Sequence, residues 1–202
     1  MICHGFKGGI GTSSRRAESA LGSFMVGVLV QANYGDREEM RIGGLPIGKV
    51  LREVPLPLIH DIPSSTRPLA PAVDSDQETG SIIVVIATDA PLSGAQCQRM
   101  ARRATVGISR MGGKGGNRSG DIFLAFATGN PGAFSLNAIT TIKQFPNGGL
   151  NPLFTAVGEA TEEAILNALV AGRDMTGIQG NSVRGLPKKE VQDFLKEHAL
   201  LR

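Results

Sequence analysis

One junction constrains this chain more than any other feature, because a turn-forming stretch meets an apolar strand at Gly80–Ser81. Residues 55–80 are rich in proline, acidic and hydroxyl side chains, a composition that resists both helix and central strand. Residues 81–87 then carry an uninterrupted Ile/Val run, as in a strand that is buried on both faces. We therefore predict an exposed, mobile loop over 55–80 that leads directly into a core strand.

Regular elements are predicted on both sides of this junction. Residues 22–32 form an apolar, β-branched run closed by a turn signal, and residues 40–50 resemble a hairpin or an edge strand. The remaining predicted elements are a helix at 93–110, a strand at 121–127, a helix at 151–171 and a short amphipathic helix at 188–200. Strands interleaved with long helices predict an α/β or α+β fold, with residues 1–202 as a single domain.

Composition argues against several classes of function. The net charge of +3 is mild, and one Tyr without any Trp offers no stacking platform, so we expect no nucleic-acid partner. No apolar run reaches the roughly 18–20 residues of a membrane span, and the N-terminus lacks signal-peptide architecture. We therefore expect a cytoplasmic protein without membrane contact. Cys3 and Cys97 lack metal-ligand spacing and are expected to be free thiols, with one disulfide as the alternative, so no metal or cofactor is predicted.

The glycine-rich stretch at residues 4–14 has two interpretations. Its backbone N–H groups could bind a phosphate. However, the stretch lacks the P-loop order, in which glycine is followed by lysine and then by Ser or Thr, and no strand precedes it. A glycine-rich strand or bulge packed against another backbone fits better. His4, His60 and His198 have no supporting motif for a Ser-His-Asp triad, so each is expected on the surface or in a structural role.

The junction itself could carry chemistry. If the Gly80–Ser81 bond were cut, Ser81 would gain a free α-amine beside its own hydroxyl, and such an amine has a reference pKa of about 7.7–8.0. One residue would then supply both the nucleophile and the base. Gly80 has no side chain to obstruct attack on its carbonyl and permits a strained peptide.

A second polar group precedes the strand predicted at 121–127. In Ser119-Gly120-Asp121, a carboxylate beside a buried strand needs a hydrogen-bond partner or a functional reason. On spacing alone, a turn with an Asp at the strand edge is the simpler interpretation.

Several long motifs resemble the L-aminopeptidase/D-esterase family, which includes the β-peptidyl aminopeptidases. They lie at residues 3–15, 27–35, 80–92, 160–165 and 180–183, and the likeness is weakest across 55–79. The resemblance implies an αββα sandwich and a precursor that cleaves itself before a serine. On this chain the cut would fall between Gly80 and Ser81, leaving subunits of residues 1–80 and 81–202.

The resemblance also implies roles for four residues. Ser81 is the nucleophile, Ser119 and Asp121 are the family's second serine and its neighbouring carboxylate, and Asn33 is the asparagine that stabilises the oxyanion. The implied substrates are short peptides, amino-acid amides or esters, which would be opened from the amino end through an acyl-enzyme. The family further implies a homo-oligomer.

Family members carry a substantial section before the motif that begins at Cys3, whereas this sequence starts almost at it. We therefore expect an N-terminally truncated sandwich with missing strands, exposed apolar faces and a need for association. Three alternatives to an active hydrolase stay open. They are a catalytically silent remnant that acts as a folding or interaction module, an acyltransferase of the ornithine acetyltransferase kind, and a glycine-loop nucleotide-binding protein.

Overall fold

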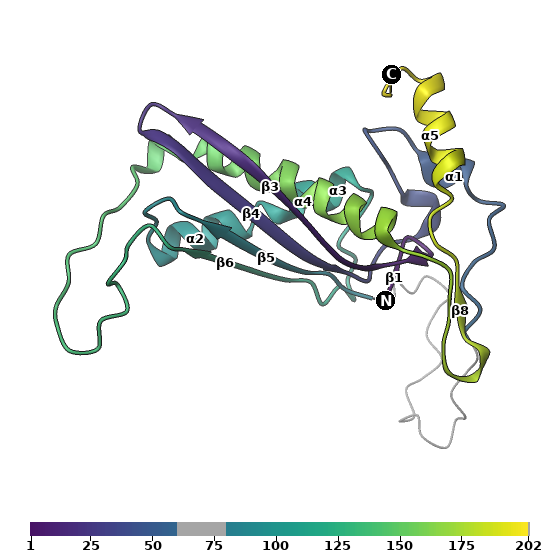
Figure 1. The fold of residues 1–202 in the computed structure, drawn as a ribbon, viewed down its shortest axis with the longest axis horizontal. Coiled ribbons are helices and arrows are strands. Elements are labelled where there is room, and N and C mark those ends of the chain that lie inside the picture. Colours follow the sequence, from purple (N-terminus) through teal and green to yellow (C-terminus); the bar gives the residue numbers. More distant parts are fainter. Residues whose placement is uncertain (60–79, 202) are drawn as a thin grey trace.

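A four-stranded sheet forms the centre of the protein in the computed structural model, which describes residues 1–59 and 80–201 (Figure 1). The strand order is β3-β4-β5-β6, with β3 at Gly9–Ser19, β4 at Gly22–Ala32, β5 at Ile83–Thr88 and β6 at Ile122–Ala127. Strand β4 is antiparallel to both β3 and β5, whereas β5 and β6 run parallel. The strands predicted at 22–32, 81–87 and 121–127 and the α+β class are therefore confirmed. The expectation that the strand at 81–87 is buried on both faces is wrong, because Val84 and Ile86 are buried on one face while Ile83 is 36% exposed on the other. Most of the loop predicted at 55–80, with His60, lies outside the described residues.

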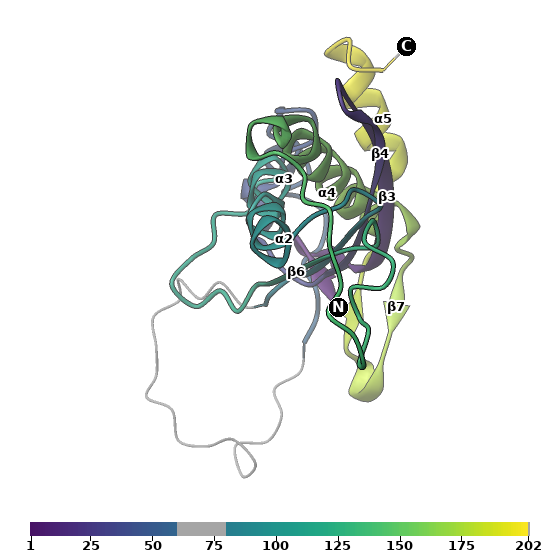
Figure 2. The same ribbon diagram turned by 90° about the vertical axis from the view of Figure 1, so that its left-hand side faces the viewer.

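The helices α2, α3 and α4 cover one face of this sheet (Figures 1 and 2). They span Gly94–Ala101, Ala104–Arg110 and Asn151–Ala171. Helix α4 has the bounds that its apolar spacing predicts, and it packs along β3 and β4. The connection between the parallel strands β5 and β6 runs through α2 and α3, as parallel pairing requires a crossover.

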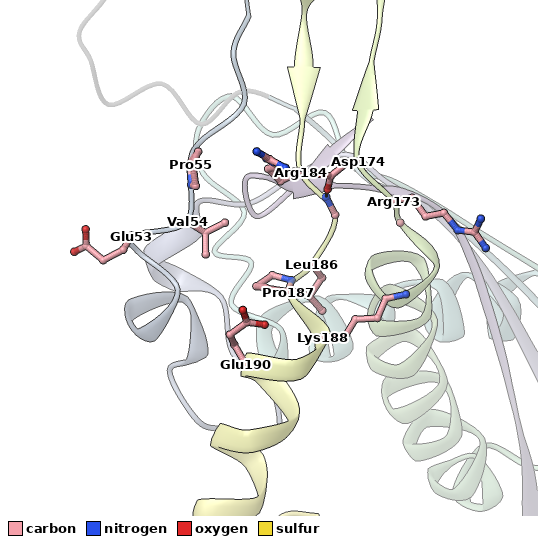
Figure 3. Close-up of a pocket in the computed structure, with 12 residues that line it drawn as sticks. Glu53, Val54, Pro55, Arg173, Asp174, Arg184, Leu186, Pro187, Lys188 and Glu190 are labelled. Carbon is pink, nitrogen blue, oxygen red and sulfur yellow. Dashed lines mark hydrogen bonds and ion pairs between the residues drawn. The ribbon is translucent and has the colours of Figure 1, made fainter.

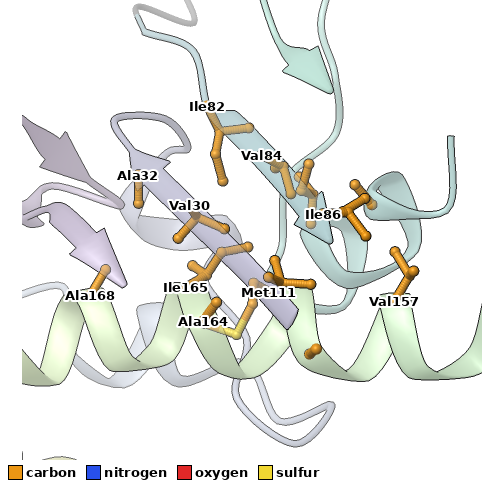
Figure 4. Packing of buried hydrophobic residues seen from close by; sticks show 14 of the residues in the cluster. Val30, Ala32, Ile82, Val84, Ile86, Met111, Val157, Ala164, Ile165 and Ala168 are labelled. Carbon is orange, nitrogen blue, oxygen red and sulfur yellow. The ribbon is translucent and has the colours of Figure 1, made fainter. Parts of the chain in front are cut away.

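The core lies between this helical layer and the sheet (Figure 4). Alternate residues of β4 and β5 point into it, so that Val30, Val84 and Ile86 are fully buried against Ile165 and Met111. Side chains that alternate across a pleated strand produce this one-sided burial.

Glycine brings β3 directly against α4. A Cβ on Gly11 would overlap Ala164 O and would lie 2.9 Å from the Cβ of Ala168. The prediction of a glycine-rich strand packed against another backbone is therefore confirmed. Polar contacts continue the same seam, since Ser13 Oγ donates to Glu163 Oε2 at 2.7 Å.

The opposite face of the sheet is open. Seven large apolar side chains on it are 36–58% exposed: Ile10, Met25, Leu29, Ile83, Ile122, Leu124 and Phe126. We call this set the open face. An αββα sandwich packs two sheets face to face, and the described residues supply one sheet with its helical layer.

Two predicted elements differ from the structure. Residues 40–50 form no hairpin or edge strand: an isolated bridge joins Ile42 to Leu45, and Ile47–Val50 is the short helix α1. The helix predicted at 93–110 is divided between α2 and α3. At the break, Arg103 N–H donates to Met100 O and Val106 N–H donates to Arg103 O, so the backbone bonds span three residues instead of the four of an α-helix. Ser93 caps α2 as predicted, in a capping box with Gln96.

Short elements surround the sheet at one end. The hairpin β1 (Ile2–Cys3) and β2 (Phe6–Lys7) precedes β3, and a second small hairpin joins β7 (Met175–Thr176) to β8 (Ser182–Val183). Residues 37–39, 147–149 and 178–180 form 3₁₀ turns. The chain ends with helix α5, Lys188–Glu197, within the predicted range 188–200.

Candidate functional site at the Gly80–Ser81 junction

The peptide before Ser81 is held tightly against the end of β4. Gly80 has φ +126°, a conformation that residues with side chains rarely adopt. A Cβ at this position would also overlap Asn33 O and would lie 3.3 Å from Asn33 Nδ2. Glycine is therefore required here both by the backbone conformation and by the close approach of Asn33.

The loop before β6 meets the same junction. The backbone N–H of Gly120 donates to Ser81 Oγ at 3.0 Å, and Ile82 N–H donates to Asp121 Oδ1, also at 3.0 Å. Parallel pairing of β5 with β6 causes this meeting, because the residues that precede the two strands lie side by side. The structure thus brings Ser81 and Asp121 together, although they are 40 residues apart in the sequence.

Ser119 lies beside them but bonds within its own loop. Its Oγ accepts a long hydrogen bond of 3.4 Å from the backbone N–H of Asp121. The Asp121 carboxylate, which the resemblance assigns to polarising Ser119, accepts from the strand backbone at Ile82. This carboxylate therefore ties the start of β5 to the start of β6.

Asn33 stands on the other side of Gly80, at the end of β4. Its Oδ1 accepts from the backbone N–H of Ile2 at 2.9 Å. Because a backbone N–H can only donate, this bond identifies the oxygen of the side-chain amide and leaves Nδ2 on the side of Gly80. Asn33 thus presents a hydrogen-bond donor beside the Gly80–Ser81 peptide.

A cavity of about 760 Å³ adjoins the junction and is lined in part by Asn33 and Gly80. Its wall carries Asp36 and Glu39, and Lys114 Nζ lies 3.3 Å from one of these carboxylates and 3.1 Å from the other. These three residues escaped the sequence analysis. The sequence offered one indication, which is that Asp36 and Glu39 follow the turn that ends β4.

A second cavity, of about 640 Å³, lies away from the junction (Figure 3). It opens between the start of α5 and the chain around Val54, and Arg184 pairs with Asp174 at 2.6 Å beside it. None of its lining residues is a predicted site residue. The junction cavity is therefore the one that concerns the candidate chemistry.

Two further side chains near the junction are buried and polar. Burial lowers the pKa of His4 and raises that of Tyr34 well above its usual value. His4 is fully buried, its Nδ1 lies 3.0 Å from Asp36 O, and it stands in a turn with φ +48°, which fits the structural role expected for it. Cys3 and Cys97 are free and buried, and burial raises the pKa of Cys3 to about 12.

Within residues 1–59 and 80–201, no three His, Cys, Asp or Glu side chains gather closely enough to hold a metal ion. None of the helices there is long and apolar enough to cross a membrane.

Comparison with known proteins gives consistent results. The chain is 43% identical over 202 residues to the beta-peptidyl aminopeptidase BapA of Sphingosinicella microcystinivorans, covering 100% of this chain and 50% of BapA. A beta-aminopeptidase structure from Burkholderia sp. superimposes with a TM-score of 0.80 at 47% identity, over 98% of this chain and 51% of that one.

A second solved structure defines the fold. The L-aminopeptidase D-Ala-esterase/amidase of Ochrobactrum anthropi, described as a variant of the Ntn-hydrolase fold, has a TM-score of 0.80 and 36% identity. It is matched over 100% of this chain and 51% of its own. The chain thus spans about half the length of the relatives it matches. Residues 1–183 match the model of peptidase family S58, and the chain belongs to that family.

Proposed function

We propose that this chain carries the catalytic junction of a self-cleaving aminopeptidase with an N-terminal serine nucleophile. Cleavage between Gly80 and Ser81 would divide the single domain into segments 1–80 and 81–202. Membership of peptidase family S58 supports hydrolysis of peptide-like bonds. One observation carries the assignment of the junction: Gly80, with its positive φ, lies between the Asn33 amide and the loop that contacts Ser81 Oγ.

In the maturation step, Ser81 Oγ attacks the carbonyl carbon of Gly80. The C–N bond to Ser81 breaks, the nitrogen takes up the proton that leaves the hydroxyl, and an ester joins Gly80 to Ser81 Oγ. This shift already frees the α-amine of Ser81; water then hydrolyses the ester, which restores the Ser81 hydroxyl and leaves a carboxylate on Gly80. We assign to Asn33 Nδ2, which lies beside Gly80, the donor role toward the oxyanion that forms on Gly80, a contribution typically worth about 3 kcal/mol.

The mature site would use the same atoms on substrate. The Ser81 α-amine accepts the hydroxyl proton while Oγ attacks the carbonyl of the substrate's first residue, and the leaving amine or alcohol takes that proton. Water then hydrolyses the acyl-enzyme. Asp121 holds Ile82, and thereby the start of β5, in place beside Ser119.

We propose short peptides, amino-acid amides and esters, opened from the amino end, as substrates. The names of the relatives support this class, since they are a beta-peptidyl aminopeptidase and an L-aminopeptidase D-Ala-esterase/amidase. We also propose that the protein works as a homo-oligomer, because the open face leaves seven apolar side chains in contact with solvent.

Intact-mass spectrometry of denatured, freshly purified protein tests the cleavage. We expect two fragments that divide between Gly80 and Ser81, and a single uncut chain for Ser81→Ala. Ser135→Ala, which changes an exposed serine elsewhere, serves as the matched control and should be cut like the parent. A parent chain that stays whole and releases no amine from aminoacyl amides would contradict the proposal and favour the silent remnant.

A further inference from the structure

The hairpin that precedes β3 has an unusually well-defined turn. His4 and Gly5 join β1 to β2 with φ values of +48° and +70°, which is the pattern of a type I′ turn. In a hairpin with a two-residue turn, the pair next to the turn, here Cys3 and Phe6, is joined by backbone hydrogen bonds. Because hydrogen-bonded and non-hydrogen-bonded pairs alternate in an antiparallel ladder, the next pair, Ile2 and Lys7, is not joined in this way. The N–H of Ile2 consequently points away from β2, where Asn33 Oδ1 accepts it.

This bond fixes the orientation of the Asn33 amide. An asparagine side chain can rotate by half a turn and exchange its oxygen with its nitrogen at little steric cost. The N–H of Ile2 removes that freedom, because only the oxygen can accept from it. Nδ2 is thereby kept on the side of Gly80, which is the orientation that an oxyanion contact requires.

Arg37 anchors the turn that carries Ile2. Its guanidinium donates to His4 O at 2.8 Å and to Gly5 O at 2.6 Å. The same group donates to Leu51 O at 3.0 Å and to Val54 O at 3.1 Å, so it donates to four backbone carbonyls in all.

The environment of Arg37 shows that this anchor is built into the core. The residue is only 6% exposed, and its guanidinium lies 3.5 Å from the centre of the Phe6 ring. Desolvation lowers the pKa of Arg37 to about 10, which leaves it cationic at neutral pH. A buried cation that donates to carbonyls of two separate segments, the His4–Gly5 turn and residues 51–54, makes those segments rigid relative to one another.

The turn is also tied directly to the segment that follows Asn33. His4 N donates to Tyr34 O at 2.9 Å, and His4 Nδ1 lies 3.0 Å from Asp36 O. A Cβ on Gly35 would overlap the His4 ring, so the backbone of Gly35 packs directly against this ring. The turn and the end of β4 therefore move as one unit.

We propose that Arg37 is a positioning residue for the junction: by anchoring the His4–Gly5 turn, it holds the Ile2 N–H that orients the Asn33 amide toward Gly80. Arg37 acts through Asn33 and does not touch the reacting atoms. The inference rests on the proposed function, in which Asn33 stabilises the oxyanion.

The first test removes the Ile2 N–H. The protein carries an N-terminal tag, so that Met1 keeps its place, and Ile2→Pro is compared with Ile2→Ala, which retains the N–H. We expect Ile2→Pro to slow cleavage at Gly80–Ser81 about ten-fold or more, since losing a donor to an oxyanion costs roughly 10²–10³. Ile2→Ala should stay within about two-fold of the parent, because it keeps the backbone N–H and shortens a side chain that is only partly buried.

A double-mutant cycle separates positioning from a merely structural effect. In an Asn33→Ala background, Ile2→Pro should slow cleavage by no more than about two-fold further, because the amide that it orients is gone. The same loss in both backgrounds would overturn the proposal. So would an equal loss in Ile2→Ala.

Arg37 is tested in the same two backgrounds with Arg37→Lys, which keeps a charge but cannot reach four carbonyls at once. Cleavage should slow in the parent background and hardly change further with Asn33→Ala. Gly5→Ala is the milder variant if Arg37→Lys does not fold, since its Cβ would lie 3.0 Å from Arg37 Nη2. Unchanged cleavage in both folded variants would overturn the role of Arg37.

Urea unfolding keeps this inference separate from the proposed function. A parent chain that never cleaves would defeat the proposed function, while the hydrogen bond between Ile2 and Asn33 would still couple the two residues in stability. We then expect the midpoint of the Ile2→Pro/Asn33→Ala double variant to match that of the less stable single variant. Additive midpoint shifts would overturn the positioning inference itself.

Discussion

The two faces of the four-stranded sheet have similar apolar composition but different environments. On the covered face, Val30, Val84 and Ile86 are fully buried under α4 and its neighbours, whereas Ile122 and Leu124 on the open face are more than half exposed. The strands therefore carry apolar side chains on both sides while the described residues bury one side. This difference shows that the sheet carries apolar side chains for a two-sided core, of which the described residues cover one side.

Truncation of one isoleucine on each face gives the largest expected contrast. Ile86→Ala should lower the free energy of unfolding by about 3 kcal/mol at any protein concentration, because it leaves a cavity in the core. Ile122→Ala should cost less than about 1 kcal/mol in dilute protein, where that side chain is 58% exposed. Urea unfolding at a low and a high protein concentration measures both.

The concentration dependence sharpens the comparison. A cost for Ile122→Ala that grows with protein concentration would show that a second copy covers the open face. An equal, concentration-independent cost for both variants would break the contrast between the faces.

Glycines offer a second matched pair. Gly11→Ala should destabilise the protein by about 2–3 kcal/mol, because its Cβ would overlap Ala164 O and force β3 away from α4. Gly27, on the open side of β4, has nothing within 4 Å of an added Cβ, so Gly27→Ala should be neutral or stabilise by about 0.5 kcal/mol. Thermal melts monitored by circular dichroism distinguish the two, and equal shifts would contradict the assignment of the faces.

The smallest expected effect is a pH dependence confined to the covered side. Hydrogen bonds from Ser13 and Arg15 lower the pKa of Glu163. The ionised carboxylate therefore adds to the free energy of unfolding above the ordinary glutamate pKa, and this stabilisation is lost as pH falls through the lowered value. Because the Glu163 side chain is 42% exposed, solvent screening limits the effect to a few tenths of a kcal/mol, roughly. Glu163→Gln should flatten the stability profile between about pH 5 and pH 3. If the pH dependence of stability were the same in Glu163→Gln and in the parent, the contact between Ser13 and Glu163 would not contribute to stability.

Local patterns were sufficient to predict the main elements. The Ile/Val run after Ser81 and the apolar spacing at 151–171 appear as β5 and α4, because each segment's own propensity agrees with its place in the core. The pattern at 40–50 failed because Gly43 and Gly44 adopt positive φ and close a tight turn, after which Ile47 enters a helical turn. Its apolar spacing suits either structure.

Motifs in the sequence supplied the candidate site residues but not the contacts that these residues make. Ser81, Ser119, Asp121 and Asn33 came from motifs, and their roles remain proposals. That Ile2 N–H holds Asn33 could not be predicted, because it depends on a turn with His4 at positive φ, a conformation that no local pattern specified. Burial of Arg37 depends in the same way on segments that are distant in sequence.

The burial of both cysteines makes the native protein a poor target for thiol reagents. The thiolate is the reactive form, and the raised pKa values of Cys3 and Cys97 suppress it. Labelling by a disulfide reagent would therefore report opening of the structure. Cys3 would report separation of the first hairpin, beside the turn that holds Asn33, and Cys97 would report fraying of α2. The chain thus carries two internal probes, placed on opposite sides of Ser81 in the sequence, that can time the loosening of each segment without any added label site.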